Sequence, residues 1–246
     1  MERFWLAQPG ALPANVGLNR ATWDLRYDPP PAFAHAFVFN GNPGSTPAEP
    51  EGALASPGVY RIRLTVDGNR YTQALTVVRD PRLRVAPAAL AAQHALLMRL
   101  YSGLQATWTD FKPVAELRAA VAKIAPDDTA SEVGKAAKAL VTTLDSIAGD
   151  SLTDARQVWD ARPPVWSFVD LNGEFGIELT AQDNADHVPT RAALVVASSS
   201  CAELGKLVAR WRRVVRVDLA AFNQTLARHG MPALAVPAAG NKLCSQ

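Results

Sequence analysis

The chain has 246 residues, with 25 Lys and Arg against 23 Asp and Glu, and 48% of its residues are hydrophobic. A formal charge of +2 supplies no broad positive field, which excludes general nucleic-acid binding, and the apolar fraction excludes disorder over most of the chain. Two cysteines, Cys201 and Cys244, are too few for a disulfide framework, and whether they pair is left open. No uninterrupted apolar run approaches the roughly 18 residues of a membrane span, and the N-terminal residues lack the basic-then-apolar order of a signal peptide.

The 18 prolines divide the chain into two regions. About 11 of them precede residue 88, and the alanine-rich stretch that follows is nearly free of proline until Pro163. This contrast is typical of a strand-and-turn region followed by a helical one. We therefore predict an α+β protein of two domains: a small antiparallel immunoglobulin-like β-domain over residues 1–82, and an antiparallel helical bundle over residues 83–246 that ends in a flexible C-terminal tail.

The first predicted strand covers residues 22–27, where polar and apolar side chains alternate until three consecutive prolines stop the pattern. Trp23, Leu25 and Tyr27 are expected to form one buried face of this strand. Because a buried indole of Trp23 would be a large part of the core, we predict that Trp23→Ala costs roughly 3 to 5 kcal/mol of stability.

A β-hairpin is predicted over residues 59–78, because two β-branched alternating segments flank an Asp-Gly turn. Its structural residues are expected to be Pro57 and Gly58 at the start and Asp67 and Gly68 in the turn. Residues 36–39 are a candidate for one further strand, with His35 packing at its start. An immunoglobulin-like sandwich needs about seven strands, so the β-domain is predicted to be incomplete.

After Pro87 apolar residues recur at spacings of three and four, which indicates amphipathic helices. Abundant alanine favours helix and lets helices approach closely. The expected helices cover residues 90–104, 114–124, 131–147 and 168–180, followed by a long helix from Pro189 to a stop at Gly230. Residues 127–129 are the cap candidates for the helix 131–147. The side chains expected to fill gaps between the helices are Trp108, Trp159, Trp166 and Trp211.

The candidate catalytic residues are three acids, Asp170, Glu174 and Glu178, whose spacing of four places them on one helix face. Paired carboxyl groups about 5 to 10 Å apart can cleave a glycosidic bond, which makes glycoside hydrolysis an alternative function. Three acids on one helix face more often form a solvated stripe, and no nucleophile, phosphate-loop or metal-ligand motif accompanies them. No cofactor and no metal site is therefore expected.

Other polar residues also have structural interpretations. His94 lies on an apolar helical stripe, which favours a hydrogen-bonded core or boundary histidine over a catalytic one. Asn223 begins an Asn-Gln-Thr glycosylation pattern, but inside a predicted helix the match is interpreted as chance. An anion site formed by basic side chains around Trp211 is disfavoured because helix surfaces often carry such runs; these side chains are Arg210, Arg212, Arg213 and Arg216.

Three motifs in the first 82 residues form an ordered set: residues 17–27 (GLNRATWDLRY), residues 56–68 (SPGVYRIRLTVDG), and residues 71–77 followed by Asp80-Pro81-Arg82. This set resembles the C-terminal region of bacterial sortilin-like, BNR-repeat proteins that carry a "glycosyl hydrolase" label. The resemblance implies an immunoglobulin-like segment and a helical tail that follow a β-propeller, with a further similar phrase at residues 218–223. The propeller and its Asp boxes (Ser-x-Asp-x-Gly-x-Thr-Trp) are absent from this chain, so the hydrolase label does not transfer to it.

In that family, earlier strands of the sandwich precede the GLNR motif, so the resemblance implies a fragment or a split gene. The expected function is a non-catalytic structural and interaction module of a propeller-bearing protein, exported if it is part of one and cytoplasmic if the chain is complete. Expected partners are an upstream propeller or strand-supplying polypeptide, or a second copy that associates through the β-domain. A stand-alone adaptor, docking through the helical bundle, is the other alternative.

Overall fold

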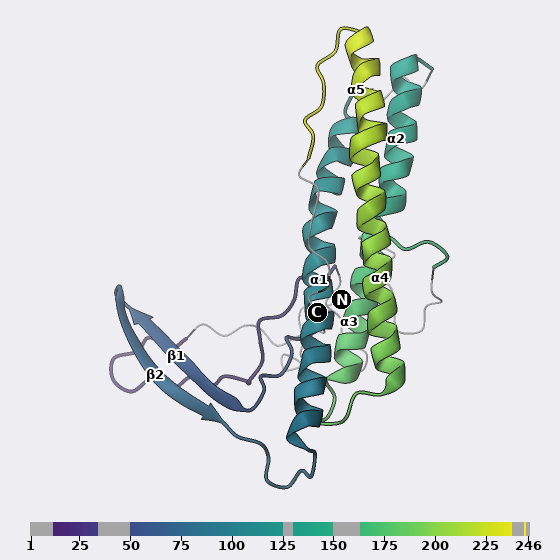
Figure 1. Ribbon diagram of the computed structural model, residues 1–246. Coiled ribbons are helices and arrows are strands. Elements are labelled where there is room, and N and C mark those ends of the chain that lie inside the picture. The colour runs from purple at the N-terminus through teal and green to yellow at the C-terminus, as the bar shows by residue number, and fades with distance from the viewer. Residues whose placement is uncertain (1–11, 34–49, 125–129, 150–162, 238–243, 245–246) are drawn as a thin grey trace, which may run out of the picture.

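The computed structural model describes residues 12–33, 50–124, 130–149, 163–237 and 244. Within these residues the chain is α+β, with one two-stranded antiparallel sheet and four helices, the last of which contains a π-helical turn. The helices lie side by side along a common long direction, while the two strands extend away from them at one end (Figure 1). The predicted α+β class is therefore confirmed.

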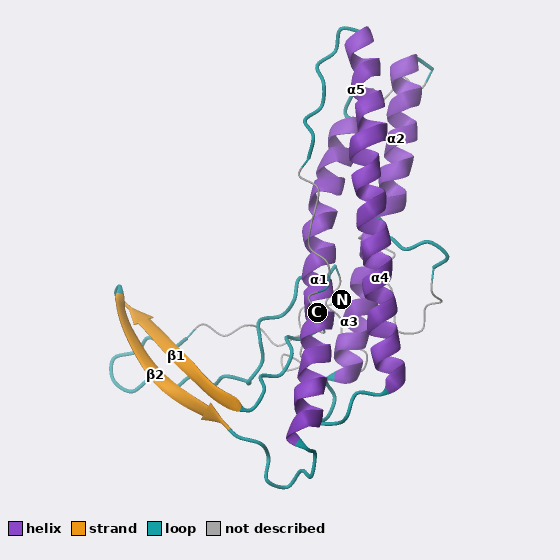
Figure 2. Cartoon of the chain, in the orientation of Figure 1, coloured by secondary structure: helices purple, strands orange, loops and turns teal. Residues whose placement is uncertain are grey.

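The sheet is the hairpin that the sequence predicts. Strands β1 (Gly58–Val66) and β2 (Asn69–Val77) pair in register from Gly58 with Val77 to Val66 with Asn69. Asp67 and Gly68 both have positive φ, 47° and 80°, which is the geometry of the two-residue type I′ turn that Asp-Gly favours. Figure 2 shows the two orange strands standing apart from the purple helices.

Helix α1 (Pro87–Ala122) is one continuous helix of 36 residues, where the sequence predicts two shorter ones. Pro87 is the first residue of the helix. At this position the backbone N–H has no partner within a helix, so a proline, which lacks that N–H, costs no hydrogen bond. Pro113 lies inside the helix and removes one backbone hydrogen bond, but the helix continues through it. The gap in the apolar pattern before Pro113 is therefore not a helix boundary.

Helices α2 (Glu132–Ala148) and α3 (Phe168–Gln182) agree with the predicted ranges and begin at serine caps. The Ser131 hydroxyl accepts a hydrogen bond of 3.0 Å from the backbone N–H of Gly134. Ser167 and Asp170 form a reciprocal capping box at the start of α3. The cap candidates at residues 127–129 lie outside the described residues.

The last helix runs without a break through α4 (Arg191–Arg213), the π-helical turn η1 (Val214–Asp218) and α5 (Leu219–Arg228). Thr190 caps its start by accepting a hydrogen bond of 3.1 Å from the Ala193 N–H. Gly230 follows its end at a φ of 69°, as the predicted glycine stop requires.

The helix Arg191–Arg228 is, among the described residues, the one helix long and apolar enough to cross a membrane by length and composition. Its most apolar window has a mean hydropathy of 1.4, and 33% of that window is buried inside the structure. Glu203 and Lys206 interrupt this window, so the sequence contains no uninterrupted apolar run there. A single helix of this kind is weak support for a membrane span, since core helices pass the same test.

The hydrophobic core lies between the four helices. Trp211, Phe168 and Phe175 are its largest fully buried side chains. A Cβ on Gly103 would lie 2.7 Å from the ring of Phe175, so a glycine lets α1 and α3 approach at this point. Trp108 and Trp166 are half-buried, and Trp159 lies outside the described residues.

Parts of the predicted β-domain pack on the helices. Residues 30–33 and 50–53 cross α1 and α3, where Pro30, Pro50 and Ala53 are buried. The buried side chain of Asn172 on α3 binds this crossing: its amide nitrogen donates to the Pro31 carbonyl, and its oxygen accepts from the Phe33 N–H at 3.1 Å. These residues therefore share a core with the helical part of the chain.

The predicted strand over residues 22–27 is absent from the structure. Trp23, Leu25 and Tyr27 are 41%, 38% and 39% exposed, and the segment makes only an isolated bridge between Arg26 and Leu54. Leu25 has a φ of 64°, a left-handed conformation that interrupts an extended strand. The prediction of one buried strand face was therefore wrong, because a local turn breaks the alternation.

The revised expectation for Trp23→Ala is a loss of about 1 to 2 kcal/mol, since removing a ring that is 41% exposed leaves no enclosed cavity. The Trp23 ring lies edge-on to Tyr60 at 5.7 Å, and its Nε1 donates to the Arg26 carbonyl at 2.8 Å. Urea unfolding of Trp23→Ala and Trp23→Phe would separate these two contacts. A loss of 3 kcal/mol or more in Trp23→Ala would restore the core-anchor interpretation.

The C-terminal segment is held at two points, where the sequence predicts a flexible tail. Asn223 on α5 exchanges two hydrogen bonds with the backbone of Leu234, at 2.8 and 3.0 Å. Cys244 forms a disulfide with Cys201 on α4. Residues 229–237 return along the helices, as the yellow trace after α5 in Figure 1 shows. The candidate strand at residues 36–39 and His35 lie outside the described residues.

Candidate interaction surface

The candidate functional site is the hairpin, because its two faces differ sharply in chemistry. Side chains alternate between the faces of a strand, so the register assigns every second residue of β1 and β2 to one face. That face is almost entirely apolar. We call it the apolar hairpin face; it consists of Tyr60, Ile62, Leu64, Val66, Tyr71, Leu75 and Val77, with Gly58, Asn69 and Gln73 between them.

The outer half of the apolar hairpin face is exposed to solvent. Ile62, Leu64 and Val66 are 48%, 49% and 46% exposed, and Tyr71 is 60% exposed. The base of the same face is partly covered, because Trp23 packs on Tyr60 and the Tyr60 hydroxyl donates to the Ser56 carbonyl at 2.6 Å. Desolvation there, with the nearby Tyr27 as the second cause, raises the pKa of Tyr60. A contiguous apolar area is therefore open at the outer end.

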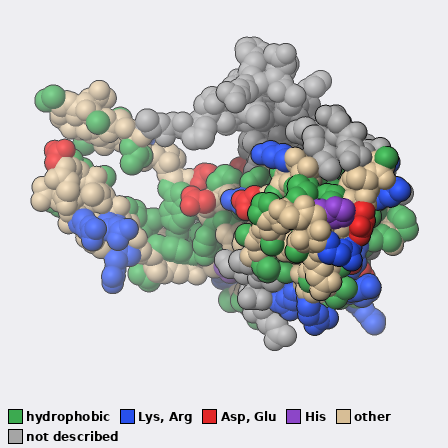
Figure 3. Space-filling view, turned by 90° about the horizontal axis from the view of Figure 1, so that it is seen from above, with side chains coloured by type: hydrophobic (Ala, Val, Ile, Leu, Met, Phe, Trp, Pro, Cys, Tyr) green, Lys and Arg blue, Asp and Glu red, His purple; other side chains and the backbone are tan. Residues whose placement is uncertain are grey.

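The opposite face of the hairpin is basic. Arg61, Arg63 and Arg70 project from it, among threonines, Ala74 and, at the base, Val59. Within the described part of the chain none of these three guanidinium groups forms an ion pair. Figure 3 shows blue side chains gathered on the part of the molecule that stands away from the helices. We call this the arginine face.

Both edges of the sheet lack a neighbouring strand among the described residues, since the sheet consists of β1 and β2 alone. Each edge therefore presents backbone N–H and C=O groups without a ladder partner. An isolated two-stranded hairpin is marginally stable in water, and an apolar face with open edges is a template for another strand.

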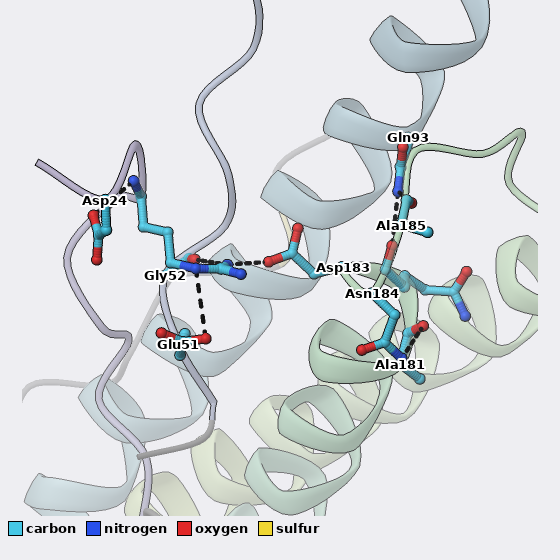
Figure 4. A network of polar contacts seen from close by, with 10 residues as sticks. Asp24, Glu51, Gly52, Gln93, Ala181, Asp183, Asn184 and Ala185 are labelled. Carbon is cyan, nitrogen blue, oxygen red and sulfur yellow. Dashed lines mark hydrogen bonds and ion pairs between the residues drawn. The ribbon is translucent and has the colours of Figure 1, made fainter. Parts of the chain in front are cut away.

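A polar network ties Arg26 and residues 51–52, which precede the hairpin, to the end of α3 (Figure 4). Arg26 donates to the Gly52 carbonyl at 2.9 Å and forms an ion pair with Asp183 at the end of α3. Gln93 on α1 donates to the carbonyls of Gln182 and Ala185 and thereby orders the turn that contains Asp183. Sequence reasoning missed this network because Arg26 and Asp183 are separated by 157 residues.

A cavity of about 180 Å³ lies beside this network, between the hairpin base, α1 and the turn after α3. His94 lines it from α1, with its ring 6.0 Å from that of Tyr27. Its Nδ1 has no hydrogen-bond partner within the described residues. Asp80 also lines the cavity, and hydrogen bonds from Arg82 lower the pKa of its carboxyl group. His94 thus lies at the boundary of the helical core, as predicted, but its Nδ1 lacks the predicted hydrogen bond within the described residues.

The three candidate acids do not form an open site. Asp170 is occupied in the capping box of α3, where it accepts hydrogen bonds from the backbone and hydroxyl of Ser167. Glu174 is 3% exposed and lies in the core, while Glu178 is half-buried. None of the three lines the cavity at the hairpin base. No group of His, Cys, Asp and Glu side chains suited to a metal ion occurs in the regions that the structure describes.

The basic side chains around Trp211 lie along the helix surface. Arg210 is engaged with α2, since its guanidinium donates to the carbonyl and hydroxyl of Ser146 at 3.1 and 2.8 Å. Arg212, Arg213 and Arg216 are exposed. Asn223 uses its side-chain amide to hold Leu234, which agrees with a structural role for that residue.

The resemblance to sortilin-like, BNR-repeat proteins depends on the motif residues alone. Of those motifs, the structure describes the hairpin in full and the GLNR segment as irregular chain. Comparison of the chain with protein-family models, with curated proteins and with solved structures finds no match.

Proposed function

We propose that this protein is a non-catalytic structural and interaction module, in which the apolar hairpin face docks against another polypeptide. The module consists of an incomplete immunoglobulin-like β-domain and an antiparallel helical bundle. It serves as the C-terminal region of a propeller-bearing exported protein, and its principal partner is the upstream propeller or a strand-supplying segment of it.

The single observation that carries this proposal is the uncovered outer half of the apolar hairpin face. Four large side chains of that face are between 46% and 60% exposed, although the chain has a well-packed core elsewhere. Exposed contiguous apolar area of this kind marks interaction sites on soluble proteins. The two strands found among the described residues are also far short of the roughly seven that a closed immunoglobulin-like sandwich needs, so strands from outside would complete it.

The disulfide supports an exported protein. Cys201 and Cys244 are bonded across 43 residues of sequence, and disulfides persist in oxidising compartments such as the periplasm. The sugar-cleaving alternative has no such support, because Asp170 is used in the capping box of α3 and Glu174 is buried, which leaves only the half-buried Glu178. A sugar-cleaving activity that Glu174→Gln abolishes in a folded chain would reverse this assignment.

The experiment is co-expression of the chain with the product of the reading frame immediately upstream, which the proposal expects to contain Asp boxes. We expect the two to co-purify, and Leu64→Asp on the apolar hairpin face to reduce the amount recovered at least tenfold, because a buried unpaired carboxylate opposes docking. Thr65→Asp, one residue away on the arginine face, is the matched control and is expected to co-purify normally. An upstream product without Asp boxes, failure of the pair to associate, or equal recovery of both variants would contradict the proposal. An unrelated partner on the helices would favour the adaptor alternative.

A further inference from the structure

We infer that two copies of this chain associate through the free edge of β2, in a symmetric antiparallel pairing centred on Gln73. The inference rests on the proposed function in that it uses the same hairpin, but it concerns the edge of the sheet and not the apolar hairpin face. It follows from the hydrogen-bond pattern and the charges of the two edges.

The register shows which backbone groups of the hairpin have no ladder partner among the described residues. Val66 and Asn69 flank the two-residue turn, so they form a hydrogen-bonded pair, and bonded and non-bonded pairs alternate from there along the hairpin. In β2 the odd-numbered residues bond to β1. The even-numbered residues Arg70, Thr72, Ala74 and Thr76 point their N–H and C=O groups outward, as residues 59, 61, 63 and 65 do on the β1 edge.

A two-fold axis can relate two identical strand edges in several antiparallel registers. In only one of them does every residue of the strand find a partner, namely the register in which the middle residue lies opposite its own copy. For β1 this residue is Ile62, and the pairing would place Arg61 directly opposite Arg63 of the other copy, twice. Like charges directly opposite each other destabilise a sheet. The two arginines thus protect the β1 edge from self-pairing.

The same operation on β2 brings no like charges together. Centred on Gln73, it places Tyr71 opposite Leu75, Thr72 opposite Ala74, and Arg70 opposite Thr76 of the other copy. All nine residues of the strand overlap, and the outward-pointing groups of both copies face each other in bonded pairs. Aromatic–aliphatic cross-strand pairs stabilise such a ladder. The product is a four-stranded sheet in which the apolar hairpin faces of both copies lie on the same side.

The full chain is the material for the test, because residues 30–33 and 50–53 share a core with the helices. Sedimentation over a concentration series is expected to show a reversible change from one chain to two. In the proposed pairing Gln73 and its copy form a non-hydrogen-bonded pair with Cα atoms about 4.5 Å apart, which suits a disulfide. Gln73→Cys is therefore expected to cross-link to a dimer under mild oxidation. Ile62→Cys, its hairpin neighbour on the same face, is the matched control and is expected to remain uncross-linked.

A second pair of variants tests the edge without a thiol. Ala74→Pro removes an outward N–H from the β2 edge and leaves the hairpin ladder intact, so it is expected to abolish the dimer. Arg61→Pro makes the same change at the neighbouring position on the β1 edge and is expected to leave the dimer unchanged. A monomer at every concentration, equal cross-linking of both cysteine variants, or loss of the dimer in Arg61→Pro would overturn the inference. Binding of the upstream polypeptide by a strictly monomeric chain would preserve the proposed function while rejecting the dimer.

Discussion

Trp211→Ala is expected to lower the free energy of unfolding by about 3 to 5 kcal/mol. Trp211 is fully buried on α4, and it is among the largest fully enclosed side chains of the described chain. Removing the indole would leave a cavity that the surrounding helices can fill only in part, so the lost transfer energy and the cavity both contribute. Urea unfolding followed by circular dichroism at 222 nm, the usual helix signal, would measure the loss from the shift of the midpoint.

Two further variants make this measurement specific. The Trp211 Nε1 is buried without an acceptor among the described residues, so Trp211→Phe removes an unsatisfied donor together with part of the volume. Its expected cost is less than half of that of Trp211→Ala. Val195→Ala, at a 59% exposed position on the same helix, should change stability by less than about 0.5 kcal/mol. Equal losses in Trp211→Ala and Val195→Ala would contradict the buried position of the indole.

Loss of the disulfide between Cys201 and Cys244 is expected to lower the free energy of unfolding by about 4 kcal/mol. The bond closes a loop of 43 residues, and the chain-entropy relation gives this value for a loop of that length. It also fastens the segment after α5, which otherwise depends on the hydrogen bonds between Asn223 and Leu234. The measurement is urea unfolding of the wild-type chain with and without a thiol reductant.

The double variant Cys201→Ser with Cys244→Ser is the control for this prediction. It should match the reduced wild-type chain and should not respond to the reductant. If the oxidised wild type, the reduced wild type and the double variant all unfold at the same urea concentration, the bond does not constrain the folded chain.

Local signals in the sequence were sufficient for the hairpin and for most helices. Asp67 and Gly68 specify a type I′ turn by themselves, and Gly230 marks a helix end through its positive φ. Residues 22–27 misled the prediction because alternation indicates a strand only when a neighbouring strand pairs with it. Instead the chain turns at Leu25, whose carbonyl accepts a hydrogen bond from the Ala55 N–H. Arg26, the next residue, forms an ion pair with Asp183.

The continuity of α1 through Pro113 also depended on contacts that sequence spacing does not show. Phe33, from a segment about 75 residues earlier in the chain, packs against Trp108 and Phe111 and covers the helix just before the proline. As for the interaction surface, the sequence predicted the hairpin and its turn residues, and the register of β1 and β2 then assigned its side chains to two distinct faces. Which of these faces would be uncovered depended on the absence of a second sheet from the described chain.

The π-helical turn at Val214–Asp218 has a consequence for how this helix tolerates insertions and deletions. An i→i+5 turn accommodates one residue more than an α-helical turn. Deleting a residue within α4 would rotate the preceding part of the helix by about 100° relative to the rest and move Leu204 and Leu207 off the core. Deleting a residue within the π turn would instead restore an ordinary α-helical turn and keep both buried faces in place. Natural length variation in this helix should therefore concentrate at residues 214–218.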